Sequence, residues 1–154
     1  MTMVDDRKLD ADTGRWASVS ILLVEDNPLD ARSTIRAARK LNVGELVEVV
    51  TDGQAALDRL RRGLHDDPIG LVLLDLNLPG KDGHDVLAEI RADRDLCTTP
   101  VVILTSSLDT ADVQGAYQGG ANAYVGKPTG LDGWLQAMAT IREFWLSLAV
   151  LPGS

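Results

Sequence analysis

The sequence is poor in cysteine, in aromatic residues and in basic charge. Its 154 residues contain one cysteine, Cys97, so no disulfide can form within the chain, and a zinc site built from several cysteines is excluded. Lys and Arg number 15 against 23 Asp and Glu, which gives a formal net charge of −8. A chain this acidic is a poor general binder of nucleic acid or of an anionic membrane surface. We therefore expect neither as a partner, whereas the charge leaves room for a basic protein or a metal cation.

Long hydrophobic runs are also missing. No apolar stretch approaches the roughly 18 residues that a membrane span needs, and residues 1–18 lack the apolar core of a secretory signal. We interpret residues 1–18 as a flexible leader and expect a cytoplasmic protein. Apolar residues make up 45% and charged residues 25%, as in a globular domain. The length suits one domain, which we place at residues 19–150, followed by a C-terminal tail at 151–154.

Short apolar runs alternate with segments of helical periodicity. The runs are typical of buried parallel strands and occupy residues 20–24, 46–50, 69–74, 101–104 and 123–125. The helices expected after them occupy residues 28–41, 54–62, 83–92, 109–118 and 131–148. This alternation predicts an α/β fold with a doubly wound five-stranded parallel sheet. Such folds bind ligands at the carboxyl ends of their strands.

Chemically distinctive residues follow four of the five expected strands. Glu25 and Asp26 follow the first strand, Asp75 follows the third, and Thr105 and Lys127 follow the fourth and fifth. A single acid after a strand is usually a helix cap or a solvated loop residue. All five in this order are hard to explain by chance, so we expect them to gather at one edge of the sheet.

The expected cluster suits phosphoryl transfer. Three carboxylates within a few ångströms repel one another and need a cation, and oxygen ligands suit Mg²⁺. Such an ion can neutralise a phosphoryl group, and a carboxylate can itself be the nucleophile that becomes an aspartyl phosphate. The ammonium of Lys127 would pair with the phosphate, and the hydroxyl of Thr105 could donate a hydrogen bond to it.

Four motifs carry a family resemblance. They are Leu23-Val24-Glu25-Asp26-Asn27, Leu73-Leu74-Asp75-Leu76-Asn77-Leu78-Pro79, Leu104-Thr105-Ser106 and Gly126-Lys127-Pro128. With these motifs and their spacing, residues 21–148 resemble the receiver domain of two-component response regulators. The resemblance implies a flavodoxin-like (βα)5 receiver fold and a signalling protein rather than an enzyme. It also implies Mg²⁺ as cofactor and a sensor histidine kinase as partner.

The resemblance assigns roles at the metal and phosphate site. It implies that Asp75 is the phosphoacceptor and also contacts the metal. Asp26 would be a direct Mg²⁺ ligand, Glu25 would assist through water, and the backbone carbonyl of Asn77 would be a further ligand. Glu25 departs from the family, which often has Asp there, but its longer side chain still reaches the metal. Asn77 and Ser107 occupy positions that tune the hydrolysis of the phosphate in this family.

The resemblance also implies a conformational switch. The hydroxyl of Thr105 would move onto the phosphate, Lys127 would pair with it, and the Lys127–Pro128 bond would be cis. Tyr124 occupies the aromatic switch position, where the ring turns inward after Thr105 moves. Without the family, Tyr124 would be interpreted as a half-buried strand residue with a solvated hydroxyl.

The C-terminal helix has more large apolar residues than one helix needs to bury. Trp134, Phe144, Trp145 and Leu146 form this excess, and we predict that they form a homodimer contact. The alternative is that they close the lower end of the domain's own core. Together with the loops after the first and third strands, this tail resembles the stand-alone regulators paired with phytochrome histidine kinases. No output domain is expected after Ser154.

Two other functions compete with a phosphorylated switch. One is a receiver-like protein-interaction module that works without phosphate, and uptake of phosphate from a small acyl phosphate would separate the two. The other is a hydrolase with an aspartyl nucleophile. Such enzymes need a cap over the substrate and a second acid beside the nucleophile, whereas Asp75 is followed by Leu76 and Asn77 and no insertion is long enough for a cap.

Overall fold

The computed structural model describes residues 19–152, so the predicted leader and the last two residues lie outside the described part. The strands are β1 (Ile21–Val24), β2 (Val47–Val50), β3 (Leu71–Leu74), β4 (Val101–Thr105) and β5 (Ala123–Gly126). The α-helices are α1 (Pro28–Lys40), α2 (Gly53–Arg62), α3 (Gly83–Ala92), α4 (Thr110–Gln118) and α5 (Gly130–Ile141). Two further segments are the 3₁₀-helix η2 (Gly44–Leu46) and the π-helix η3 (Arg142–Leu148).

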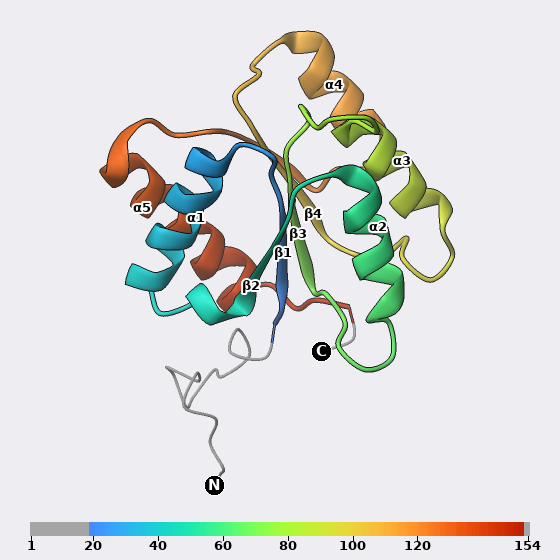
Figure 1. The fold of residues 1–154 in the computed structure, drawn as a ribbon, viewed down its shortest axis with the longest axis horizontal. Coiled ribbons are helices and arrows are strands. Elements are labelled where there is room, and N and C mark those ends of the chain that lie inside the picture. The colour runs from blue at the N-terminus through green and yellow to red at the C-terminus, as the bar shows by residue number, and fades with distance from the viewer. Residues whose placement is uncertain (1–18, 153–154) are drawn as a thin grey trace, which may run out of the picture.

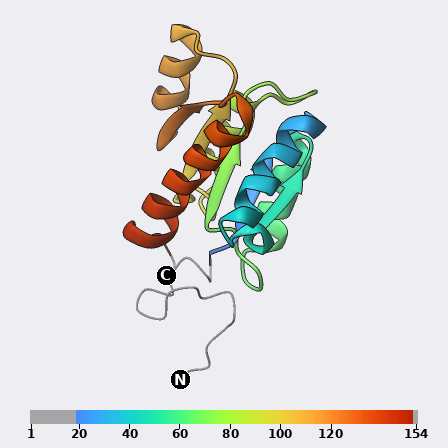
Figure 2. The same cartoon turned by 90° about the vertical axis from the view of Figure 1, so that its left-hand side faces the viewer.

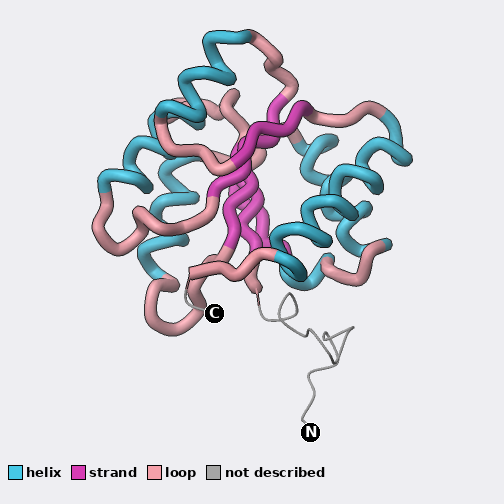
Figure 3. The backbone as a smooth tube through the Cα atoms, turned by 180° about the vertical axis from the view of Figure 1, so that it is seen from behind, coloured by secondary structure: helices cyan, strands magenta, loops and turns pink. Residues whose placement is uncertain are grey.

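All five strands form one parallel sheet with the order β2-β1-β3-β4-β5. Helices α1 and α5 cover one face of the sheet, and α2, α3 and α4 lie on the other side (Figures 1 and 2). Seen from behind, the strands form a central layer between the two groups of helices (Figure 3). The predicted doubly wound fold is confirmed. The strand order reverses between β1 and β3, which predicts a ligand crevice beyond their carboxyl ends.

Strands β1 and β3 are buried along their whole length, as their continuous apolar sequences predict. Successive side chains point to opposite faces of the sheet. Leu22 and Val24 therefore join the core beneath α2 and α3, while Ile21 and Leu23 join the core beneath α1 and α5. Because both faces are packed, the ends of these two strands form a rigid base for the residues that follow them.

The start of α1 fixes the path of the chain after β1. Asn27 caps the helix, its side-chain oxygen accepting hydrogen bonds from the backbone N–H groups of Leu29 and Asp30. Pro28 takes the first helical position, where no backbone donor is needed. The chain therefore turns from strand to helix within three residues, and Glu25 and Asp26 lie at the edge of the sheet.

The C-terminal segment differs from the single helix predicted for residues 131–148. The α-helix ends at Ile141 and continues as the wider π-helix η3, which the backbone N–H of Ala149 closes on the carbonyl of Phe144 at 2.7 Å. None of the helices within residues 19–152 combines the length and the apolar composition that crossing a membrane requires.

The predicted contact surface is wrong at two of its four residues. Trp134 and Leu146 are 5% and 2% exposed and lie in the chain's own core with Ala37 and Ala38 of α1. The small alanine side chains leave volume that these large residues fill. Trp145 is partly buried against the same core, and Phe144, 47% exposed, packs edge-on against its ring.

Candidate functional site

Three carboxylates meet at the ends of β1 and β3, as predicted. One side-chain oxygen each from Glu25, Asp26 and Asp75 can be chosen so that all three lie within 4.8 Å of one another. Glu25 is 1% exposed and Asp75 is 3% exposed, whereas Asp26 is open to solvent. A cavity of about 530 Å³ at the cluster is lined by Asp26 and Asp75 and also by Asn77 and Ser106. The site thus combines two buried acids with an open side from which a ligand can enter.

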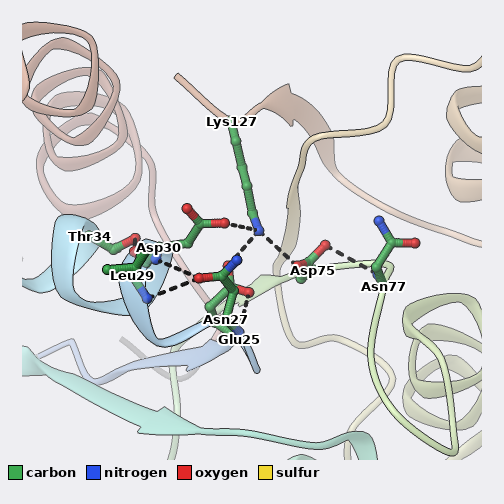
Figure 4. Close-up of polar contacts among 8 residues, drawn as sticks. All are labelled: Glu25, Asn27, Leu29, Asp30, Thr34, Asp75, Asn77 and Lys127. Atoms are coloured by element: carbon green, nitrogen blue, oxygen red, sulfur yellow. Dashed lines mark hydrogen bonds and ion pairs between the residues drawn. The ribbon is translucent and has the colours of Figure 1, made fainter. Parts of the chain in front are cut away.

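Lys127 reaches into this cluster from the segment after β5. Its ammonium nitrogen lies 2.8 Å from Glu25 Oε1, 2.9 Å from Asp75 Oδ2 and 2.8 Å from Asp30 Oδ2 (Figure 4). Its backbone N–H donates to the carbonyl of Thr105 at 2.8 Å, which ties the segment to the end of β4. The buried phosphoacceptor candidate and its predicted cationic partner are therefore in direct contact.

Asp30 is the member of the cluster that the sequence reasoning missed. It lies in the first turn of α1, where an acid is ordinarily explained by the positive end of the helix dipole. The sequence did indicate that Asp30 lies near the cluster, because the helical turn capped by Asn27 follows directly after Glu25 and Asp26. Only the three-dimensional structure shows that the Asp30 carboxylate turns toward the cluster.

The charges of the cluster are not balanced. Burial raises the pKa of Glu25 to about 7, and the neighbouring Asp75 adds to this effect while Lys127 opposes it. Burial acts in the same direction on Asp75, but the Lys127 ammonium and the backbone N–H of Asn77 outweigh it, so the pKa of Asp75 lies below its usual value. Burial would lower the pKa of Lys127, but Asp30, Glu25 and Asp75 raise it above its usual value.

A divalent cation fits this donor set. The carboxylates of Glu25, Asp26 and Asp75 form the cluster, and Asp30 adds a fourth negative charge beside it. Among the described residues the one ammonium at the site is that of Lys127, which contacts Glu25, Asp30 and Asp75, so an excess of negative charge remains. All candidate ligand atoms are oxygens, the type that Mg²⁺ and similar hard ions prefer.

Of the predicted switch residues, Thr105 is the last residue of β4, Tyr124 lies on β5 and Lys127 follows β5. Thr105 is completely buried, and its hydroxyl has no hydrogen-bond partner among the described residues. Tyr124 is partly buried, and its hydroxyl donates to the carbonyl of Ser107 at 2.7 Å. Burial raises the pKa of this hydroxyl. The alternative of a solvated hydroxyl does not hold, because the tyrosine is bonded to the backbone of the segment that follows Thr105.

A polar chain connects this segment to two helices. The hydroxyl of Ser107 donates to Asp112 Oδ2 on α4 at 2.6 Å, and Asp112 Oδ1 lies 3.2 Å from Nε2 of His84 on α3. These contacts lower the pKa of Asp112, the Ser107 hydroxyl having the largest effect. Ser107 is thereby held from both sides, by Tyr124 through its carbonyl and by Asp112 through its side chain.

The predicted cis bond is not found. No peptide bond among residues 19–152 is cis, so Lys127–Pro128 is trans. The trans form is the lower in energy for a bond before proline, by about 0.5–1 kcal/mol. From this backbone the Lys127 side chain still reaches its carboxylate partners.

The family described as "Response regulator receiver domain" matches residues 21–139, and the chain belongs to it. Receiver domains are signalling proteins that bind a divalent metal at an acidic pocket, and the carboxylate cluster of this chain lies at that pocket. The class of protein is therefore a receiver-domain response regulator.

Two curated relatives and two solved structures show the relationship more closely. The chain is 40% identical over 135 residues to the probable methanogenesis regulatory protein FilR2 of Methanothrix harundinacea, covering 86% of this chain and 87% of that protein. It is 37% identical over 137 residues to the response regulator Rcp1 of Synechocystis, covering 87% of this chain and 93% of Rcp1.

The two solved structures are also of response regulators. The phosphorylated cyanobacterial phytochrome response regulator RcpA superposes with a TM-score of 0.81 at 40% identity, over 88% of this chain and 99% of RcpA. The Mn²⁺-bound form of Rcp1 gives a TM-score of 0.75 at 37% identity, over 88% and 99% of the two chains. The chain is thus a response regulator related to Rcp1 and to the phytochrome regulator RcpA.

Proposed function

We propose that this chain receives a phosphoryl group on Asp75 from a sensor histidine kinase, with Mg²⁺ as cofactor. The observation that carries the proposal is the contact between the buried carboxylate of Asp75 and the ammonium of Lys127, at 2.9 Å. The similarity to RcpA favours a phytochrome as the sensor that supplies the phosphate. The absence of any cysteine pair agrees with a cytoplasmic location, which we also propose.

The chemistry follows from the groups in the site. An oxygen of the Asp75 carboxylate forms a bond to phosphorus, while the bond from phosphorus to the kinase histidine breaks and its electron pair stays on the imidazole nitrogen. Lys127 offsets the negative charge on the phosphoryl oxygens as a point charge. Glu25, Asp26, Asp75 and the carbonyl of Asn77 would hold Mg²⁺, which supplies charge neutralisation when bound.

The conformational switch begins at Thr105 in this proposal. Its buried hydroxyl makes no complete hydrogen bond with the described residues, although it contributes to the lowered pKa of Asp75, so a phosphoryl oxygen on Asp75 offers it a stronger partner. Movement of Thr105 displaces Ser107, two residues later, and with it the carbonyl that holds Tyr124. Phosphate shifts the population only because it bonds Thr105 in one of the two arrangements.

Two further roles belong to the same proposal. Asn77 and Ser107 tune how fast water removes the phosphate, a role that their positions two residues beyond Asp75 and Thr105 have in the receiver family. The chain also forms a homodimer through the part of the C-terminal segment that is not buried. Support for this contact now rests on Phe144, Leu148 and Val150, which are 47%, 70% and 75% exposed.

Intact mass measurement tests the phosphoacceptor. The parent chain incubated with Mg²⁺ and acetyl phosphate should gain one phosphoryl group of about 80 Da. Asp75→Asn should gain nothing, and Asp58→Asn, which removes an exposed carboxylate of α2, should behave as the parent. A folded parent that takes up no phosphate from acetyl phosphate or from its kinase would leave the phosphate-independent interaction module as the better description.

A further inference from the structure

Asp30 completes the environment of Lys127. Its Oδ2 lies 2.8 Å from the ammonium nitrogen, as close as Glu25 Oε1 and slightly closer than Asp75 Oδ2. A lysine ammonium has three N–H donors and no acceptor, so three carboxylates saturate it. In the resting chain, Lys127 has no donor left for a phosphoryl oxygen unless one of these contacts is released.

The position of Asp30 is fixed by its own backbone. Its N–H donates to the Asn27 side chain at 3.2 Å, and its carbonyl accepts from the hydroxyl of Thr34 at 2.8 Å. The carboxylate therefore extends from an anchored helical turn toward a lysine that lies 97 residues later in the sequence. Figure 4 shows Asp30 and Asp75 on opposite sides of the Lys127 ammonium.

The three carboxylates differ in what else they are needed for. Glu25 and Asp75 belong to the candidate metal cluster and are almost completely buried, whereas Asp30 lies outside that cluster and its side chain is 31% exposed. Asp30 is thus the one partner of Lys127 whose charge serves neither the metal nor the acceptor.

We propose that Asp30 is a positioning residue that restrains the Lys127 ammonium in the resting chain and competes with the incoming phosphoryl group for it. This inference rests on the function proposed above. With acetyl phosphate, an oxygen of Asp75 bonds to phosphorus, the bond from phosphorus to the acetate oxygen breaks, and acetate leaves with the electron pair. Lys127 must turn from Asp30 toward the phosphoryl oxygens during this step, so the restraint slows phosphorylation.

The rate of phosphorylation tests the competition. Asp30→Asn, measured by intact mass with Mg²⁺ and subsaturating acetyl phosphate, should react about three- to tenfold faster than the parent, as expected for release of one partly exposed charged hydrogen bond. Asp30→Glu keeps the carboxylate and should restore the parent rate. Asp58→Asn removes the same charge from the exposed face of α2 and should leave the rate unchanged.

A second background separates restraint from simple charge repulsion. In Lys127→Gln there is no ammonium to restrain, so adding Asp30→Asn should change the rate by less than about twofold. An Asp30→Asn chain that reacts at the parent rate or more slowly would overturn the proposal. An equal acceleration in both backgrounds would also overturn it, because Lys127 would then play no part.

The restraint can also be measured without phosphate or metal. In the metal-free chain, nitrogen-15 NMR of the lysine side chains reports how fast the Lys127 ammonium hydrogens exchange with water. Asp30→Asn should accelerate this exchange by about threefold or more, and Asp30→Glu should restore it. Unchanged exchange would reject the restraint, whether or not the parent accepts phosphate. A parent that accepts no phosphate would refute the proposed function separately.

Discussion

The hydroxyl of Tyr124 donates a hydrogen bond to the backbone carbonyl of Ser107 at 2.7 Å. This bond joins β5 to the segment that follows the buried Thr105 at the end of β4. The hydroxyl of Ser107 is bonded in turn to Asp112 of α4. The tyrosine is therefore part of the resting arrangement, and its release is coupled to any movement of the segment after β4.

Tyr124→Phe removes this bond and keeps the ring. We expect the free energy of unfolding of the unphosphorylated chain to fall by about 1 kcal/mol, the usual contribution of a hydrogen bond of this kind. Urea unfolding followed by circular dichroism measures the change. Phosphate uptake with acetyl phosphate should stay within about twofold of the parent, because the hydroxyl does not contact the cluster around Asp75. A variant as stable as the parent would show that water replaces the bond without loss.

Thr105→Val tests whether the unpartnered hydroxyl of Thr105 stabilises the resting chain or is needed only for the response to phosphate. Valine has nearly the same shape, and the Thr105 hydroxyl is buried with no partner among residues 19–152. We expect the resting chain to be as stable as the parent or more stable by about 1 kcal/mol, since an unsatisfied polar group is removed. Urea unfolding measures this difference.

The same variant should lose the response to phosphate. Hydrogen exchange of the segment around Ser107 should change on phosphorylation in the parent and in Thr105→Ser, and should change little in Thr105→Val. A Thr105→Val chain that is much less stable in the resting form would mean that the hydroxyl already has a structural role.

Glu25→Gln tests two effects of the Glu25 carboxylate. In the metal-free chain its negative charge is destabilising, and in the presence of Mg²⁺ it contributes to binding of the metal. The pKa of Glu25 is raised from 4.5 to about 7, so the folded chain binds more protons than the unfolded chain between these pH values. The stability that this group contributes is full below about pH 4.5 and is lost as the pH rises through about 7. Glutamine does not titrate. The free energy of unfolding of the metal-free variant should therefore equal that of the parent near pH 4.5 and should be larger by about 1–3 kcal/mol at pH 8.

Mg²⁺ should reverse the order of stability of the parent and Glu25→Gln at pH 8. Titration calorimetry should show weaker binding of Mg²⁺ to Glu25→Gln, because an anionic oxygen beside the metal is replaced by a neutral amide. At pH 8 and saturating Mg²⁺, the parent should then gain more stability than the variant, as ligand linkage requires. Equal stabilisation of both chains by Mg²⁺ would place Glu25 outside the metal site.

The parts of the site that could be predicted from the sequence are those fixed by local order. A buried strand ends where its apolar run ends, so Glu25, Asp75 and Thr105 are placed by the strands before them. The role of Asp30 could not be predicted in this way, because its contact with Lys127 joins segments 97 residues apart. The direction in which a side chain on the first turn of α1 points depends on how the helix packs on the sheet.

The C-terminal segment is a second place where the sequence alone does not determine which side chains are buried. Composition indicates an excess of large apolar residues there, but not which of them face inward. A π-helix has more residues per turn than an α-helix, so the change of winding after Ile141 alters which residues lie on the inner face. Leu146 is consequently buried, while Phe144 is 47% exposed.

Substitutions of Trp134 and of Phe144 should therefore have different effects, the first on stability and the second mainly on self-association. Trp134→Ala empties a buried site between α1 and α5 and should lower the free energy of unfolding by about 3–5 kcal/mol. Phe144→Ala removes a half-exposed ring and should cost less than about 1.5 kcal/mol. Phe144→Ala should also weaken self-association, measured by sedimentation velocity across a concentration series. A parent that remains monomeric at the highest concentration would refute the dimer. A dimer unaffected by Phe144→Ala would place its contact on another face.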